Sequence, residues 1–352
     1  MTKRTRTNLK MLLIVAFFVV KNALVMAQDV ETPVAYMNSI TKVQEDMNKK
    51  YLAYVSASAH GKRLRKVEKL RQQAVESISL SLTNTQLLFP YKGDNSLRQS
   101  SIDYIKFCYK LFNDDYAHIV DLEEISEQSV DEMQAYLLLQ EKTSEKLKEA
   151  NQANDLAYRA FAAKYKIEIL DSKSEKGEKM EIVGKLNKYF NKVYNQFFKS
   201  NWEDKQLTKA LTNKKVNDIE QCRNTLIKYA EEGLKALDTL RSFNGDASLA
   251  LACKQSLEAY KKLAETEIPK MTDYYLKEEN FNNIKKSFDS KSASDRTKED
   301  VDAYNKAVKE MNAGVNSYNQ TNNNANNIRN SIVNNWNSTE KSFMDSNMPY
   351  FK

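Results

Sequence analysis

Apolar side chains recur at intervals of three and four residues along much of the chain. One such series consists of Ile40, Val43, Met47, Tyr51 and Tyr54. Another consists of Leu97, Ile105, Cys108, Phe112, Ile119 and Leu122. Residues at these intervals share one face of an α-helix, so the pattern predicts long amphipathic helices that each bury one face.

Local signals mark where the first helices begin and end. Thr32 followed by Pro33 is typical of an N-cap and a first helical position, and the helix that they open runs to about residue 59. Gly61 separates this helix from a second one, which is predicted over about 62–88.

Two capping patterns open the next helices. Asp94, after the turn at 90–93, is placed to cap a third helix. Ser129 and Glu132 have the spacing of a capping box, which predicts a fourth helix that continues to about Tyr165.

The second half of the chain repeats the pattern of the first. The segments that begin at Lys42, Gly93 and Ala135 correspond to those that begin at Lys185, Gly245 and Ala303. The capping spacing recurs at Thr297 and Asp300, and the positions of the buried faces correspond in apolar character. The sequence therefore predicts an all-α fold of two tandem, internally duplicated, elongated helical bundles of about four helices each.

A polar stretch divides the two copies. Residues 171–179 are rich in Ser, Lys and Glu, and we expect them to form the linker between a first copy over 28–170 and a second copy over 180–352. Composition supports this organisation. With 352 residues, 41% of them hydrophobic, the chain is long and apolar enough for two ordinary domains. Only 7 Gly and 4 Pro leave few turn formers for an all-β fold.

The first 27 residues are predicted to be a secretory signal peptide. They are basic, then apolar from Met11 to Val20, with Val25 and Ala27 three and one residues before the expected cleavage point. A retained membrane anchor is the alternative, but the apolar run is shorter than the roughly 20 residues that cross a bilayer. No transmembrane span is therefore expected in the mature chain, and no cysteine stands at the cleavage point to carry a lipid.

Removal of the signal peptide would lower the net charge of the protein. The whole chain has 54 basic and 47 acidic side chains, a formal charge of +7. Five basic and no acidic residues lie in the first 27, which leaves 49 basic against 47 acidic side chains, a net charge of +2. The nearly neutral mature chain gives no support for a nucleic-acid partner.

Catalytic motifs give no positive support for an enzyme. The sequence has no Gly-rich phosphate loop, no Ser-His-Asp set and no Cys-x-x-Cys. Its three cysteines, Cys108, Cys222 and Cys253, cannot all pair within one chain, and we expect them to be small buried side chains.

The first candidate site is a basic run at the end of the first predicted helix. His60 is followed closely by Lys62, Arg63 and Lys66. Cations crowded over two turns are suited to an anionic ligand such as phosphate or an acidic glycan. The simpler interpretation is a solvated helix face, since apolar residues continue the buried face between the cations.

The second candidate is an aromatic stretch that ends in Trp202. Its members are Tyr189, Phe190, Tyr194, Phe197, Phe198 and Trp202. They are suited to a hydrophobic ligand slot between helices, but most of their spacings are three or four residues, which also fits core packing.

Two weaker signals concern metals and amides. His118 with Asp115 supplies half of the carboxylate-x-x-His pairs of di-metal bundles, but the duplicated position is Lys270, whose charge repels a metal. No metal and no cofactor are therefore predicted. The stretch 312–337 is rich in asparagine, a poor helix former, which indicates either a weak helix held by amide hydrogen bonds or a polar face for a ligand or partner.

Four segments spread over the chain carry a resemblance to a known family. They are Pro33–Asn38, Ala59–Lys62, Asp115–Val120 and Phe197–Ser200. In them the chain resembles an uncharacterised family of exported helical surface proteins of Gram-negative bacteria. The resemblance implies export and a surface location, and it supplies no activity and no site residues.

The leading functional hypothesis is a non-enzymatic envelope or surface protein, exported to the periplasm or cell surface, whose helical scaffold binds an unknown envelope or surface partner. The alternative is a periplasmic module that binds a small anionic or amphipathic molecule through the basic run after His60 or the aromatic stretch near Trp202. An enzyme with a metal at His118 is a third hypothesis, which predicts stoichiometric metal in the purified protein.

Overall fold

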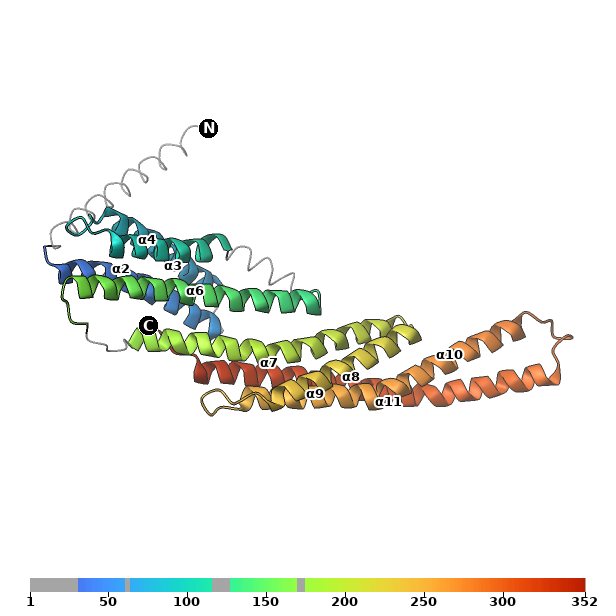
Figure 1. Ribbon diagram of the computed structural model, residues 1–352. Helices are drawn as coiled ribbons and strands as arrows, with labels where there is room; N and C mark the ends of the chain where they lie inside the picture. The colour runs from blue at the N-terminus through green and yellow to red at the C-terminus, as the bar shows by residue number, and fades with distance from the viewer. Residues whose placement is uncertain (1–30, 61–63, 116–126, 170–174, 352) are drawn as a thin grey trace, which may run out of the picture. The chain divides into compact units, whose positions relative to one another are not determined.

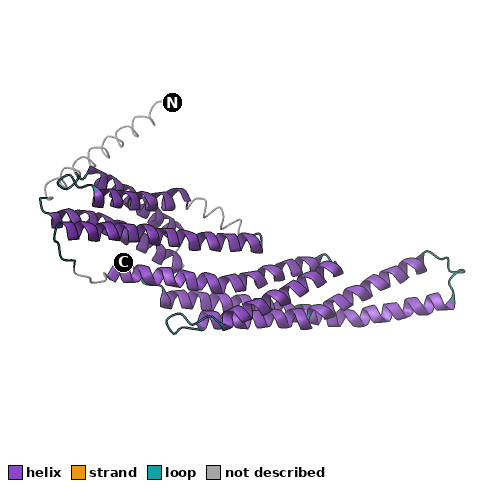
Figure 2. Cartoon of the chain, in the orientation of Figure 1, coloured by secondary structure: helices purple, strands orange, loops and turns teal. Residues whose placement is uncertain are grey.

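The computed structural model describes residues 31–60, 64–115, 127–169 and 175–351. Every regular element among these residues is a helix, and no strand occurs among them (Figures 1 and 2). The all-α fold class is therefore confirmed. No helix of the described ranges has an apolar stretch long enough to cross a membrane. The predicted signal peptide, 1–27, lies outside them.

The chain divides into two compact units. Unit 1 contains the described residues up to 115, with those of 135–185 and 348–352. Unit 2 contains those of 126–134 and 186–347. The duplication of whole bundles stays a prediction.

Long helices with short connections make up both units. In the first half of the chain they are α2 (Pro33–Ala59), α3 (Leu64–Leu87), α4 (Ser96–Tyr109), the π-helical η1 (Lys110–Asp115) and α6 (Val130–Lys164). In the second half they are α7 (Glu175–Thr212), α8 (Val216–Asp238), α9 (Ser248–Thr266), α10 (Ile268–Asp289) and α11 (Lys298–Asn347).

Side-chain caps fix several helix starts where the sequence predicts them. The Thr32 hydroxyl accepts a hydrogen bond from the amide of the third residue of α2, at 3.1 Å. The Glu132 amide donates to the Ser129 hydroxyl oxygen at 3.1 Å, and that hydroxyl donates to the Glu132 carboxylate at 2.9 Å. Thr297 and Asp300 form the complete reciprocal pair at 2.9 and 3.2 Å. Each pair satisfies amides that the first helical turn leaves open.

The predicted linker, 171–179, is in part helical. α7 begins at Glu175, and the preceding linker residues lie outside the described ranges. Acidic side chains favour a helix N-terminus, and the Glu175 carboxylate forms an ion pair with Lys179 one turn later, at 2.7 Å. The charged composition that indicates a linker therefore also stabilises a first helical turn.

The same four-residue turn precedes α4 and α9. Tyr91 and Asp94 exchange two backbone hydrogen bonds of 3.0 and 2.9 Å, and Phe243 and Asp246 exchange two of 3.0 and 2.8 Å. The third residue of each turn is a glycine with φ of +83° or +89°, a conformation that glycine adopts without steric penalty. Each aspartate then accepts the amide two residues later, at 2.9 Å. Asp94 therefore lies just before α4 rather than at its N-cap.

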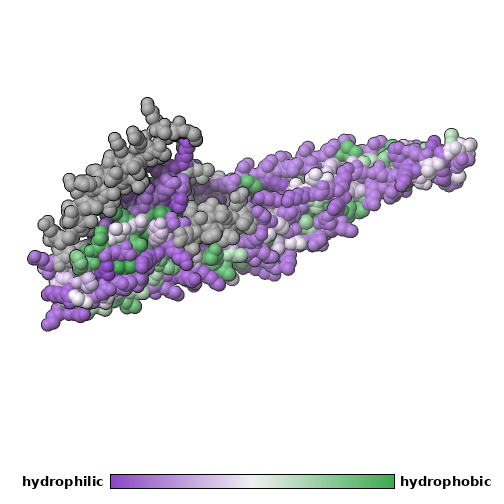
Figure 3. Space-filling view, turned by 90° about the horizontal axis from the view of Figure 1, so that it is seen from above, coloured by the Kyte–Doolittle hydropathy of each residue, from purple (hydrophilic) through white to green (hydrophobic). Residues whose placement is uncertain are grey.

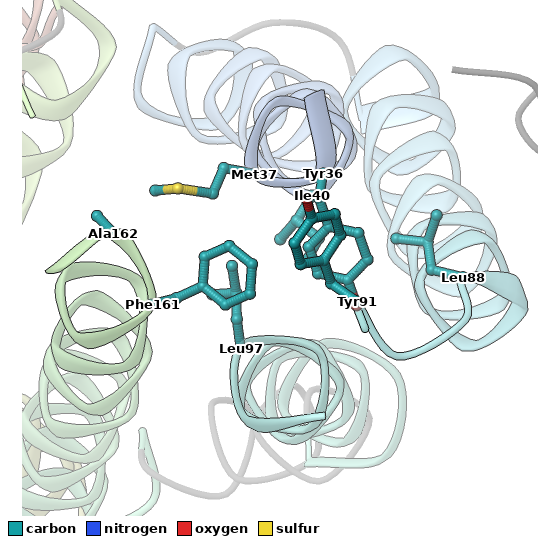
Figure 4. Close-up of a cluster of buried hydrophobic side chains, with 8 residues drawn as sticks. All are labelled: Tyr36, Met37, Ile40, Leu88, Tyr91, Leu97, Phe161 and Ala162. Atoms are coloured by element: carbon teal, nitrogen blue, oxygen red, sulfur yellow. The ribbon is translucent and has the colours of Figure 1, made fainter. Parts of the chain in front are cut away.

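The core of unit 1 includes a cluster of aromatic and aliphatic side chains from helices far apart in the sequence (Figure 4). Its members are Tyr36, Met37, Ile40, Leu88, Tyr91, Leu97, Phe161 and Ala162. The rings of Tyr91 and Phe161 both lie against that of Tyr36, each with centroids 5.5 Å away. Burying a side chain such as Phe161 stabilises the fold by about 2 kcal/mol.

The core of unit 2 brings α7, α8, α9 and α11 together. Trp336 of α11 lies face to face with Phe197 of α7, with ring centroids 4.1 Å apart. α8 approaches its neighbours closely at Gly233, where an added Cβ would lie 2.7 Å from Cδ1 of the fully buried Leu257 on α9. The missing side chain at this position therefore sets the distance between the two helices.

α10 and α11 extend past the ends of α7 and α8 as a two-helix arm (Figure 1). The rings of Phe288 and Tyr304 stack across the arm with centroids 4.6 Å apart, and the guanidinium of Arg296 lies 4.1 Å from the Phe288 ring centroid. α11 has 50 residues, and it runs without a break from the outer end of the arm into the core of unit 2.

Candidate functional site

The basic candidate residues lie where α2 ends and α3 begins. His60 is only 9% exposed, and its ring stacks on that of Tyr350 with centroids 3.9 Å apart. Lys66 is exposed on α3. Lys62 and Arg63 lie outside the described residues. One face of the imidazole is therefore covered by a tyrosine ring.

Trp202, the aromatic candidate, lies half-buried on α7. Its indole N–H donates a hydrogen bond to the backbone carbonyl of Gln128, at 3.1 Å. Phe197 and Phe198, in the same stretch, are buried in unit 2. His60 and Lys66 belong to unit 1, so neither unit contains both the basic and the aromatic candidates.

The metal candidate His118 lies outside the described residues. In the part of the chain that the structure describes, no group of three or more His, Cys, Asp and Glu side chains is arranged to hold a metal ion. All three cysteines are free, and Cys108 and Cys253 are buried. Burial raises the pKa of each of these two thiols to about 12, which keeps them protonated and unreactive.

A buried polar layer crosses unit 2. Asp204 of α7 and Arg329 of α11 form a bidentate ion pair, with nitrogen to oxygen distances of 2.8–3.0 Å and side chains 8% and 14% exposed. Beside it the Tyr260 hydroxyl of α9 donates to the Asn201 side-chain oxygen, at 2.9 Å. Because a bidentate pair is geometrically specific, it fixes how α11 lies against α7. The sequence alone does not predict this layer, because Asp204 and Arg329 are 125 positions apart in the chain.

Glu203 and Cys222 extend the layer to α8. Burial raises the pKa of the Glu203 carboxyl, because it disfavours the charged form. Burial and the hydrogen bond with Glu203 raise the pKa of the Cys222 thiol to about 11. Cys222 is therefore a thiol at neutral pH rather than a thiolate nucleophile.

The surface of α11 carries a stripe of asparagines. Its ten members, all exposed, are Asn305, Asn312, Asn316, Asn319, Asn323, Asn326, Asn327, Asn330, Asn334 and Asn337. At 3.6 residues per turn they fall within one sector of roughly 100° and extend over roughly 50 Å of the helix axis. We call this set the asparagine stripe.

The asparagine stripe lies on the side of α11 opposite its buried face. Ala325, Ile332 and Trp336, which pack into unit 2, are about half a turn away from it around the helix. Asparagines recur at positions 312, 323 and 334, and eleven residues are close to three helical turns. This spacing is the sequence signal that places the amides on one face, beyond the enrichment in asparagine itself.

The segment that carries most of the asparagine stripe is almost free of charge. Between Met311 and Thr339 the one charged residue is Arg329, which is turned inward to Asp204, whereas 29% of the whole chain is charged. Hydrophilic residues dominate the visible surface of the arm that α10 and α11 form (Figure 3). Each asparagine amide presents both donors and an acceptor of hydrogen bonds. From Asn312 to Asn337 the stripe is thus a hydrogen-bonding surface without charge, and the exposed Lys309 lies on the same face between Asn305 and Asn312.

The described residues define an all-α protein with packed apolar cores, a buried polar layer and an uncharged exposed stripe. In comparisons with known proteins, the chain matches no family model, no curated protein and no solved structure.

Proposed function

We propose that this chain is an exported envelope or surface protein that acts as a non-enzymatic helical scaffold and binds a partner through the asparagine stripe. The stripe is the observation that carries the proposal. Ten exposed residues of one type on one face are not needed for packing, because the opposite face of α11 makes the core contacts. Asparagine is also a poor helix former, so local helix stability does not account for them.

The N-terminal sequence supports export. A basic start, an apolar run and small side chains before Gln28 are the features that a signal peptidase requires. The resemblance to exported surface proteins of Gram-negative bacteria agrees with export. An exported protein meets its partner in the cell envelope or at the cell surface.

Cell fractionation with N-terminal sequencing tests whether the protein is exported and where the signal peptide is cleaved. We expect the chain outside the cytoplasm with Gln28 as its first residue. Protease treatment of intact cells separates the two envelope locations: cleavage indicates the cell surface, and protection that ends when the outer membrane is disrupted indicates the periplasm. An unprocessed chain in the cytoplasmic fraction would overturn the proposal.

A further inference from the structure

We propose that the asparagine stripe binds a neutral polysaccharide chain laid along α11. This inference rests on the proposed function, in which the stripe is a partner-binding surface, and it names the chemistry of the partner. Carbohydrate hydroxyls both donate and accept hydrogen bonds and carry no charge. Asparagine amides have the same three properties.

The composition of the stripe argues against the other classes of partner. Nucleic acid binding depends on cations that neutralise phosphates, and this face of α11 has none between Asn312 and Asn337 and a single lysine, Lys309, before them. A membrane surface requires a broad apolar face, whereas every member of the stripe is an amide. Protein interfaces are anchored by aromatic and arginine side chains at their centres, and the aromatic and arginine residues of this segment lie on the opposite side, as Trp336 and Arg329 do.

The geometry suits a repeating polymer rather than a small ligand. The stripe presents about one amide or more per helical turn of about 5.4 Å, close to the length of one sugar unit in an extended chain. Successive sugars therefore meet successive amides over roughly 50 Å. One amide–hydroxyl hydrogen bond contributes little net free energy in water, so appreciable affinity requires many of them on one polymer.

The test uses affinity electrophoresis of the full mature protein in gels that contain mannan, dextran or a mixed-linkage β-glucan. We expect at least one of these neutral polysaccharides to retard the protein, and the retardation to persist in about 0.5 M NaCl because no charge is involved. Short oligosaccharides of the same sugar should compete at least about tenfold less well per sugar unit than the polymer.

Two matched variants locate the binding. The stripe variant carries Asn316→Ala, Asn323→Ala, Asn330→Ala and Asn334→Ala; the control carries Asn217→Ala, Asn282→Ala, Asn283→Ala and Asn324→Ala, all exposed and off the stripe. Alanine is the better helix former, so the substitutions within these helices favour the folded state. We expect the stripe variant to lose at least about tenfold in affinity and the control to bind as the unchanged protein does.

Three results would overturn the inference. They are no retardation in any of the three gels, equal retardation of both variants, and light scattering that shows a dimer which only the stripe variant loses. The last result would make a second copy of this chain the occupant. In each case, cell fractionation of the same strains reports separately whether the protein is exported, so failure of the ligand assignment is distinguishable from failure of the proposed address.

Discussion

Single residues of the buried polar layer decide how the helices of unit 2 fit together. Asp204 and Arg329 are largely removed from water and held by three hydrogen bonds, and the pair couples the C-terminal part of α7 to α11. An ion pair of this kind contributes little net stability by comparison with apolar packing, but loss of one partner leaves a buried charge without compensation. We therefore infer that the pair specifies the register of α11 against α7 rather than adding to the stability of the fold.

Asp204→Asn should destabilise the protein by about 3 kcal/mol, because the guanidinium of Arg329 stays buried opposite a neutral group. Urea unfolding followed by circular dichroism measures the change. Asp273→Asn removes one partner of the exposed ion pair with Lys277 on α10 and serves as control, with an expected change below about 1 kcal/mol. Equal effects of the two substitutions would show that the buried pair has no special role.

Glu203→Gln should stabilise the protein at neutral pH and have no such effect in acid. Burial raises the folded-state pKa of Glu203 above the ordinary value of a glutamate carboxyl, so the folded protein holds this proton more tightly than the unfolded chain does. Stability from this group is therefore fully present below the unfolded pKa and is lost as pH rises through the folded pKa. Unfolding free energies of both proteins at pH 7 and below pH 4.5 give the difference. A gain of equal size at both pH values would contradict burial as the cause.

The same scale shows what sequence can and cannot reveal. The reciprocal cap of Thr297 and Asp300 is predictable because both partners lie within one helical turn. The pair of Asp204 with Arg329 is not, since it depends on which turns of two distant helices meet. The same holds for Trp202. Its place in the aromatic stretch is evident from the sequence, but its hydrogen bond to Gln128 depends on the tertiary fold.

Among elements, the contact of α8 with α9 depends on the absence of a side chain. Gly233 lies inside α8, where glycine weakens a helix, and its neighbours Leu257 and Gln196 leave no room for a methyl group. Gly184 of α7 has no heavy atom within 4 Å of an added Cβ. An alanine at Gly233 would therefore meet its neighbours, whereas an alanine at Gly184 would meet none.

Gly233→Ala should destabilise the protein by about 1–3 kcal/mol, because the added Cβ would lie 2.7 Å from Leu257 Cδ1. Gly184→Ala should stabilise it by roughly 0.5–1 kcal/mol through helix propensity alone. Thermal unfolding of both variants measures the two signs. A stabilising Gly233→Ala would mean that α8 and α9 can separate without loss of packing.

The asparagine stripe also has a predictable effect on stability. Replacing Asn316, Asn323, Asn330 and Asn334 by alanine should raise the stability of unit 2 by about 2 kcal/mol, since alanine exceeds asparagine by roughly 0.5 kcal/mol per exposed helical site. Hydrogen exchange of α11 amides measures the gain. Unchanged or faster exchange would show that the amides stabilise the helix and are not free for a ligand.

The bounds of single helices are the feature of the fold that the sequence predicts best. The periodic apolar positions and local caps specify α2 from Pro33 to Ala59 as predicted. The start of α7 is missed because Glu175 and Lys179 belong to a polar stretch that reads equally well as a loop or as a charged first turn. The asparagine-rich stretch is recognised by composition, but its single face becomes evident only when the helical period is applied to the amides.

At the scale of the whole molecule, each unit has a core of its own. In unit 1, Phe161 lies among aromatic rings from α2 and the turn before α4 (Figure 4). In unit 2, Leu257 is fully buried where α9 meets α8. A loss of packing in one core therefore has its direct effect within that unit.

Phe161→Ala should accelerate hydrogen exchange in unit 1, and Leu257→Ala should do so in unit 2, each with a loss of about 2–5 kcal/mol in local stability. Mass spectrometry of peptides from both units measures where protection falls. Uniform loss across the chain for either variant would show that the two cores unfold as one.

The uninterrupted course of α11 has a mechanical consequence. A polymer bound along the asparagine stripe, as proposed above, would pull parallel to the helix axis, and the C-terminal part of the same helix is anchored by Trp336 and Phe343. Tension in that direction shears many side-chain contacts at once, whereas a sideways pull would peel them apart one turn at a time. Resistance to such tension is set by the rate of forced unfolding rather than by equilibrium stability. We therefore expect α11 to resist a pull along its axis, the direction in which a bound polysaccharide would act, better than a pull across it.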